Sequence, residues 1–183
     1  IHYMHDSALN ELPIVLDQLI PQRPYILIGH SDGGSISLIY GAERPELLCG
    51  IVSIAAHIFV EEVTISGIEQ AKDAWQQRKL TGLSKYHGEQ TAEVFHAWNQ
   101  TWLSHWFKDW NIEYLLSSID APVLVIQGID DQYGSNKQVE NIVQKVSSEL
   151  VEYHLLANCG HSPHREATDR CLSLISEFIE KVG

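Results

Sequence analysis

The order of segments along this chain predicts an α/β fold, a mostly parallel sheet with helices on both faces and a helical insertion. Short apolar runs such as YILI at 25–28 lack polar alternation, which is typical of strands covered on both faces. Strand, helix and strand follow one another within residues 25–56, as in a βαβ unit. The 183 residues, 44% of them hydrophobic, favour one domain with its own core.

The first predicted element is a helix from Asp6 to Ile20, with Asp6 or Ser7 as its cap. Its apolar residues recur at helical spacing: Leu9, Leu12, Val15, Leu16 and Leu19. The prolines of PQRP end this helix, and a buried strand follows in YILIGH. A helix over 35–43 and a strand over 47–56 complete the first βαβ unit.

Residues 58–117 differ from the rest of the chain because they contain all five tryptophans and no strand-like run. The strand pattern returns in APVLVIQG at 121–128. It is followed by a predicted helix over 135–148, a strand over 151–156 and a final helix over 166–181. We therefore divide the chain into a first core segment (1–57), a helical insertion (58–117) and a second core segment (118–183).

Composition excludes several classes of partner. The net charge of −12 would repel a polyanion, so we expect no nucleic-acid partner. No apolar stretch approaches the length of a membrane span, so we expect no membrane partner. The three cysteines cannot all pair and none lies in a C-x-x-C motif, which predicts reduced thiols and a cytoplasmic protein.

The pattern G-x-S-x-G is met by Gly29, Ser31 and Gly33, directly after a predicted buried strand and before a helix. A sharp turn at this place lifts a serine hydroxyl above the sheet, and glycines on both sides leave room for the backbone. The alternative is a glycine-rich turn whose serine only caps the helix. The placement favours a nucleophile, with the backbone N–H of Asp32 as an oxyanion donor.

A serine nucleophile needs a base and an acid that orients the base. His161 lies in the loop after the last predicted strand, and His164 is its rival at the start of the final helix. His30 is expected to point away from the position of the base. The loop GIDDQYG offers Asp130 and Asp131, although two aspartates could equally form a solvated turn. The chain order Ser, Asp, His agrees with a triad.

These stretches resemble the α/β-hydrolase superfamily, in its serine-nucleophile, cofactor-free branch of bacterial esterases, carbon–carbon bond hydrolases and valacyclovir-hydrolase-like enzymes. The resemblance rests on ILIGHSDGGSISLIYG, PVLVIQGIDDQYG and ANCGHSPH. It implies Ser31 as nucleophile, Asp131 as the acid at the end of a G-x-x-D pattern, and His161 as base. Residues 58–117 would be the cap, and no metal or organic cofactor is implied.

The chain departs from that family at its front. A complete member has four strands before the nucleophile strand, so roughly 80 to 100 residues are expected to be absent here. The strand at 25–28 would then be an exposed apolar edge, which a second copy or a partner chain could cover. The second oxyanion donor would be absent too. Either these residues belong to a longer gene product of which this chain is a part, or the protein lacks them.

The insertion offers candidate substrate walls in Trp98, Trp102, Phe107 and Trp110. The spacing of Trp98 and Trp102 on one helical face favours the alternative that they pack the insertion itself. His57 follows the second strand and faces either the site or the core. The leading function is a serine hydrolase that cleaves a small carboxylic ester or similar acyl bond. The alternatives are a carbon–carbon bond hydrolase with the same triad and a non-catalytic remnant that serves as a binding protein.

Overall fold

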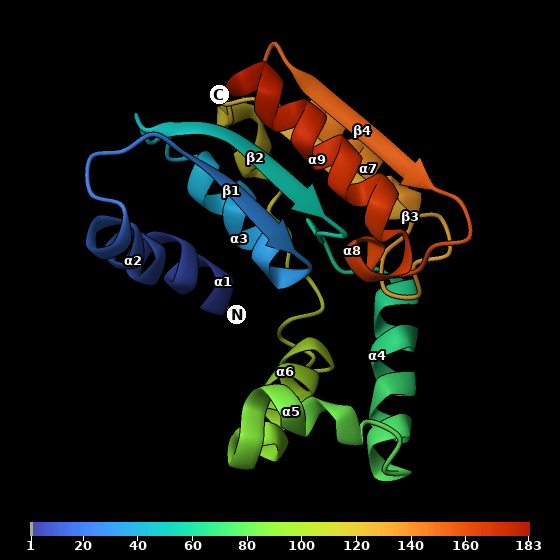
Figure 1. Cartoon of the computed structure of the whole chain (residues 1–183). Coiled ribbons are helices and arrows are strands. Elements are labelled where there is room, and N and C mark those ends of the chain that lie inside the picture. The colour runs from blue at the N-terminus through green and yellow to red at the C-terminus, as the bar shows by residue number, and fades with distance from the viewer. Residues whose placement is uncertain (1) are drawn as a thin grey trace.

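The computed structural model describes residues 2–183 and contains one four-stranded sheet within them (Figure 1). Its strands are β1 (Tyr25–His30), β2 (Leu48–Ile54), β3 (Val123–Gly128) and β4 (Val151–Leu156). They lie in the order β1-β2-β3-β4, and every neighbouring pair is parallel. The predicted α/β class with a parallel sheet is confirmed.

Helices cover both faces of this sheet. α3 (Asp32–Gly41) and α7 (Asn136–Lys145) pack on one face, and α9 (Thr168–Val182) packs on the other. The final helix predicted over about 166–181 agrees with α9 within two residues, and a separate short helix, α8 (Pro163–Glu166), precedes it. α3 begins directly behind Ser31, three residues earlier than predicted, which places its N-terminus at the serine.

The two faces of the central strands fill two cores. Side chains that alternate along β2 and β3 point to opposite sides, so each strand is apolar throughout. Ile51, Val123 and Val125 belong to the core beneath α3 and α7. Val52, Leu124 and Ile126 pack with Leu174 and Phe178 of α9. This double burial is the physical reason for the uninterrupted apolar runs in the sequence.

The N-terminal helix is continuous through α1 (Tyr3–Asp6), a π-helical segment η1 (Ser7–Glu11) and α2 (Leu12–Leu19). The predicted cap is wrong, because Asp6 and Ser7 both have helical backbone angles inside this helix. Met4 and Ala8 are fully buried, and this part of the helix packs against α3. Much of the predicted apolar stripe is exposed instead, and Leu19 is 74% exposed.

β1 is an edge strand of the described sheet, as the sequence predicts, and β4 is the other edge. Its Ile28 is 52% exposed, whereas every residue of β3 is buried. Because an unpaired apolar strand invites association, this side of the molecule is open to a further chain. That a second copy or a partner chain covers it stays a prediction.

The insertion between β2 and β3 is helical within the described residues. It comprises α4 (Glu62–Gln76), η2 (Thr81–Leu83), α5 (Ser84–His87), η3 (Gly88–Gln90), α6 (Thr91–Trp102) and η4 (Glu113–Ser118). Figure 1 shows α4, α5 and α6 beyond the end of the sheet toward which the strands point. Phe107 and Trp110 are buried in the same core as Leu38 of α3, so they pack the core of the fold. That residues 58–117 form a separate cap stays a prediction.

Two features of composition can be compared with the structure. Cys49, Cys159 and Cys171 are all free of disulfides. Across residues 2–183, no helix combines the length and the apolar character needed to cross a bilayer. The cytoplasmic location stays a prediction.

Candidate active site

Ser31 occupies a sharp turn between β1 and α3. Its backbone has φ 55° and ψ −123°, a conformation that costs a non-glycine residue about 1–3 kcal/mol. The Ser31 N–H donates to the Ile54 carbonyl at 2.8 Å, which ties the turn to the end of β2. The turn therefore holds the serine at the carboxyl end of the sheet, where the loops of neighbouring parallel strands meet.

The glycines of the motif do not have equal roles. A Cβ at Gly29 would lie 2.1 Å from the Gly33 carbonyl oxygen, so this position must be glycine. A Cβ at Gly33 would meet nothing within 4 Å, and the predicted need for space there is wrong. Gly34, which follows the motif, is also tight, because a Cβ there would lie 2.9 Å from that of Ala56.

Three side chains predicted from separate motifs lie in one chain of hydrogen bonds. His161 Nε2 lies 3.0 Å from Ser31 Oγ, across 130 residues of sequence. His161 Nδ1 lies 3.0 and 2.9 Å from the two carboxylate oxygens of Asp131. Because a carboxylate only accepts, Nδ1 carries the proton and Nε2 is free to accept from the serine hydroxyl. Asp130 is exposed and lies outside this chain.

The Asp131 carboxylate is held by its own loop. Its side chain is 1% exposed, and Oδ1 also accepts from the backbone N–H groups of Tyr133 at 2.8 Å and Gly134 at 3.3 Å. A Cβ on Gly128 would lie 2.1 Å from the Cys159 carbonyl oxygen, so the loops that carry Asp131 and His161 touch here. The acid and the imidazole are therefore positioned by one pair of packed loops.

The loop around His161 has a brace that sequence reasoning missed. The carboxylate of Glu166 accepts from the backbone N–H of Gly160 at 2.8 Å and from that of Ser162 at 2.9 Å. These two residues flank His161 on either side. The only sequence signal was an acidic residue shortly after the histidine, which by itself does not predict this contact.

His30 does not point away from the site, contrary to the prediction. Its Nε2–H donates to the His161 carbonyl at 2.7 Å, and the two rings are 4.9 Å apart. Burial lowers the pKa of His30, which keeps the imidazole neutral near neutral pH. His164, the rival base, lies in α8 with its ring 4.6 Å from that of His30, and it is His161 whose Nε2 lies at hydrogen-bond distance from Ser31 Oγ. The two extra histidines thus pack beside the site without taking the place of His161.

Asp32 connects the serine turn to distant parts of the chain. Its Oδ2 accepts from the Tyr3 hydroxyl at 2.6 Å, and that hydroxyl accepts from the indole N–H of Trp102 at 3.1 Å. Burial raises the pKa of the Asp32 carboxyl, while the hydrogen bond from Tyr3 opposes this rise. The contact joins α1, α3 and α6 at the site, and the sequence offered no signal that selects Tyr3.

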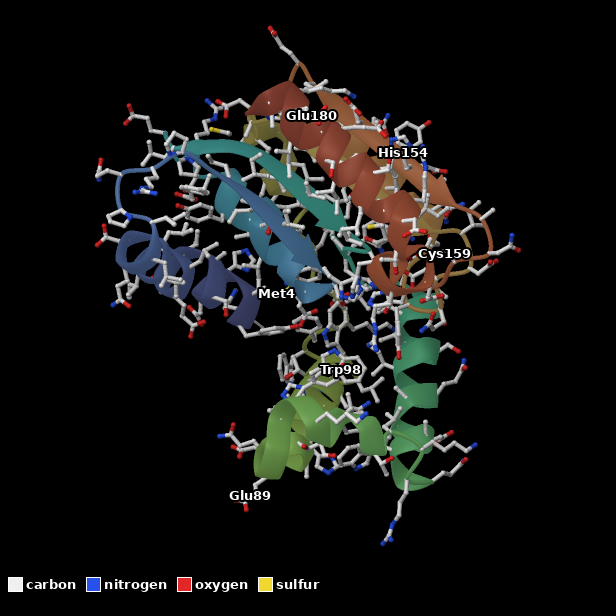
Figure 2. All side chains as sticks on the ribbon, in the orientation of Figure 1. Met4, Glu89, Trp98, His154, Cys159 and Glu180 are labelled. Atoms are coloured by element: carbon white, nitrogen blue, oxygen red, sulfur yellow. The ribbon has the colours of Figure 1, made fainter. Side chains whose placement is uncertain are left out.

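A cavity of about 240 Å³ opens beside Ser31. Its lining residues come from both core segments and from the insertion: His30, Ser31, Asp32, His57, Thr64, Ile68, Trp98, Trp102, Tyr133 and His161. Trp102 is 1% exposed and packs on Phe107, as expected for a residue that packs the interior. It also lines the cavity. Trp98 is only partly buried and lies where the insertion meets the sheet (Figure 2).

Among residues 2–183, no three His, Cys, Asp or Glu side chains are grouped to hold a metal ion.

Comparison with known families agrees with this architecture. The model of the alpha/beta hydrolase family matches residues 3–174, which is most of the chain. The chain belongs to the alpha/beta hydrolase family.

Individual relatives of this alpha/beta hydrolase are distant. It is 21% identical to the proline iminopeptidase of Saccharolobus solfataricus, over 98% of this chain and 70% of that protein. Among solved structures, a membrane phospholipase A superposes with a TM-score of 0.76 at 21% identity, over 98% of this chain and 63% of that one. The CarC serine hydrolase of carbazole degradation superposes with a TM-score of 0.76 at 16% identity, over 98% of this chain and 72% of that one. At these identities the structural likeness shows the fold alone.

His57 supports the acid loop of this alpha/beta hydrolase. Its Nε2–H donates to the Tyr133 carbonyl at 2.9 Å, and the Thr64 hydroxyl donates to the same oxygen at 2.6 Å. His57 is 3% exposed and also lines the cavity at Ser31. It therefore belongs to the core and faces the site, whereas the sequence predicted one or the other. Burial lowers the pKa of His57 to about 4, and the imidazole is therefore neutral in the folded protein.

This buried imidazole predicts a loss of stability in acid. The unfolded chain binds a proton on residue 57 near pH 6.5, whereas the folded chain does so near pH 4, so stability falls as pH drops between these values. From neutral pH to about pH 5, the free energy of unfolding should fall about 2 kcal/mol further in the wild type than in His57→Gln. Urea unfolding at both pH values measures this difference. Equal losses in the two proteins would show that His57 is not the titrating group.

Proposed function

We propose that this chain is a serine hydrolase that cleaves a small carboxylic ester through an acyl-enzyme intermediate. The observation that carries the proposal is the hydrogen-bond chain from Ser31 through His161 to Asp131 at one wall of a cavity. Membership of a family of hydrolases supports it. The proteins to which the chain is similar include one described as an esterase and one named a proline iminopeptidase, and both names denote hydrolases.

In the proposed mechanism, Ser31 Oγ attacks the ester carbonyl while His161 Nε2 takes its proton. The imidazolium then gives that proton to the leaving alcohol, and an acyl group remains on Ser31. Water repeats the same two proton transfers and releases the acid. Asp131 keeps Nδ1 protonated and stabilises the imidazolium. Each step is an addition to a carbonyl, an elimination or a proton transfer, so the mechanism invokes no cofactor.

Negative charge on the carbonyl oxygen needs donors. We assign one to the backbone N–H of Asp32, the first residue of α3, whose N-terminal amides are not all used within the helix. A donor of this kind contributes on the order of 100- to 1,000-fold in rate. The neighbouring Asp32 carboxylate bonds to Tyr3, a contact that holds this end of α3 in place.

A fluorophosphonate tests the proposal directly. Intact-mass spectrometry should show one adduct on the wild type and none on Ser31→Ala. Ser173→Ala, an exposed serine on α9, serves as the matched control and should label like the wild type. A folded wild-type chain that takes no adduct would refute the enzyme and favour the alternative of a binding protein.

If the protein is labelled, a second experiment identifies the type of substrate bond that it cleaves. Turnover of p-nitrophenyl butyrate that is lost in Ser31→Ala would support the ester hydrolase. Cleavage of a vinylogous diketone without ester turnover would favour the carbon–carbon bond hydrolase, which uses the same three residues.

A further inference from the structure

A second cavity, here called the distal chamber, adjoins the cavity at Ser31. Its volume is about 320 Å³. Its lining consists of Ala71, Leu80, Leu83, His87, Thr91, Val94, Phe95, Trp98 and Tyr133. Trp98 and Tyr133 line both cavities, and their rings meet edge to face with centroids 6.3 Å apart. These two rings therefore form a wall that the two cavities share.

The distal chamber is built for an uncharged occupant. Its lining contains no Asp, Glu, Lys or Arg, and five of its residues are aliphatic or phenylalanine. Burial raises the pKa of the Tyr133 phenol, which therefore stays neutral. Since a charged group in such surroundings would lose its hydration without a partner, the chamber favours an apolar group.

The wall of the chamber is held open by packing outside it. Phe95 is 6% exposed and stacks on Trp75 with ring centroids 4.3 Å apart and an interplanar angle of 9°. This stack joins α4 to α6. The stack therefore fixes the position of Phe95, which lines the chamber.

We propose that the distal chamber binds an apolar arm of the ester whose carbonyl lies at Ser31. The proposal rests on the proposed function, because it takes the reacting bond from there. Each methylene that leaves water adds roughly fourfold to binding in the transition state. Four added methylenes would give about 250-fold if all were buried, and about 16-fold if half of them were. An ester with an arm of eight carbons should therefore exceed its four-carbon counterpart in kcat/KM by on the order of 10- to 100-fold.

Two substrate series separate the two possible arms. One series is p-nitrophenyl butyrate and octanoate, which lengthens the acyl side. The other is butyl and octyl acetate, which lengthens the alcohol side. The proposal expects a preference for the longer member in at least one series, and that series names the arm.

A pair of variants on α6 tests the location. Val94→Trp places a large ring at a chamber residue that is 41% exposed, so the fold has room to accept it. Ala92→Trp adds the same ring two residues earlier, at an exposed position that lines neither cavity. In the preferred series, the ratio of kcat/KM for the long and short esters should fall at least about tenfold in Val94→Trp. The ratio in Ala92→Trp should equal that of the wild type.

Binding without turnover keeps the inference separate from the proposed function. Titration calorimetry on Ser31→Ala should give tighter binding of methyl octanoate or octyl acetate than of the four-carbon esters, and the added Val94→Trp should remove the difference. Equal binding of long and short esters would overturn the proposal that the distal chamber binds an apolar arm, whether or not the wild type hydrolyses these esters. Tighter binding of the long ester by an unreactive protein would support the chamber and refute only the proposed reaction.

Discussion

Asp131→Asn is expected to lower kcat for p-nitrophenyl butyrate by roughly 10⁴-fold while the protein stays folded. The carboxylate now accepts from His161 Nδ1 and from the backbone N–H groups of Tyr133 and Gly134. An asparagine keeps one acceptor oxygen and turns the other site into a donor. That donor faces Nδ1, which favours the tautomer with the proton on Nε2. Such an imidazole cannot take the proton of Ser31.

Asp130→Asn is the matched control for this experiment. It makes the same chemical change one residue away, at an exposed side chain outside the hydrogen-bond chain. We expect its kcat to stay within a few-fold of the wild type, because an exposed charge acts weakly through water. Equal losses in both variants, or a normal rate in Asp131→Asn, would contradict the assignment of the acid. Urea midpoints of both proteins confirm that folding is not the cause.

The relation between the serine, the acid and the histidine could be predicted from sequence for a topological reason. Each lies at or shortly after the carboxyl end of a predicted strand, and these strands belong to one parallel sheet. Carboxyl ends of parallel strands meet at one edge, so residues 130 positions apart come within hydrogen-bond distance. The choice of Asp131 over Asp130 came from the family resemblance, and the geometry places Asp131 at His161.

Contacts that depend on how loops approach one another could not be predicted. Tyr3, His30 and Glu166 each bond to the site, but nothing in their spacing selects their partners. Apolar periodicity has a similar limit. It identified Leu19 and its neighbours as a helical stripe, but it could not show that they lie exposed while Met4 and Ala8 pack on α3. Periodicity tells which residues are apolar, and only the tertiary structure tells what covers them.

The G-x-S-x-G motif requires glycine at position 29, and Gly29→Ala tests this requirement. The added Cβ would lie 2.1, 2.3 and 2.6 Å from the Gly33 carbonyl oxygen, the Gly33 carbonyl carbon and the Gly34 nitrogen, all of them backbone atoms. The turn must therefore open. We expect the free energy of unfolding to fall by about 3 kcal/mol. Displacement of Ser31 by even ~1 Å should slow fluorophosphonate labelling at least 100-fold.

Gly33→Ala is the matched control, since both glycines belong to the same motif and receive the same methyl group. Its Cβ would meet nothing within 4 Å, and alanine in a helix is about 0.5–1 kcal/mol more stable than glycine. We expect labelling at the wild-type rate and a slightly higher urea midpoint. Comparable damage from the two substitutions would mean that the motif needs both glycines and that the turn is tighter around Gly33 than its geometry indicates. A difference between them would assign the strict requirement to Gly29, because there the backbone of the helix crosses directly over the end of the strand.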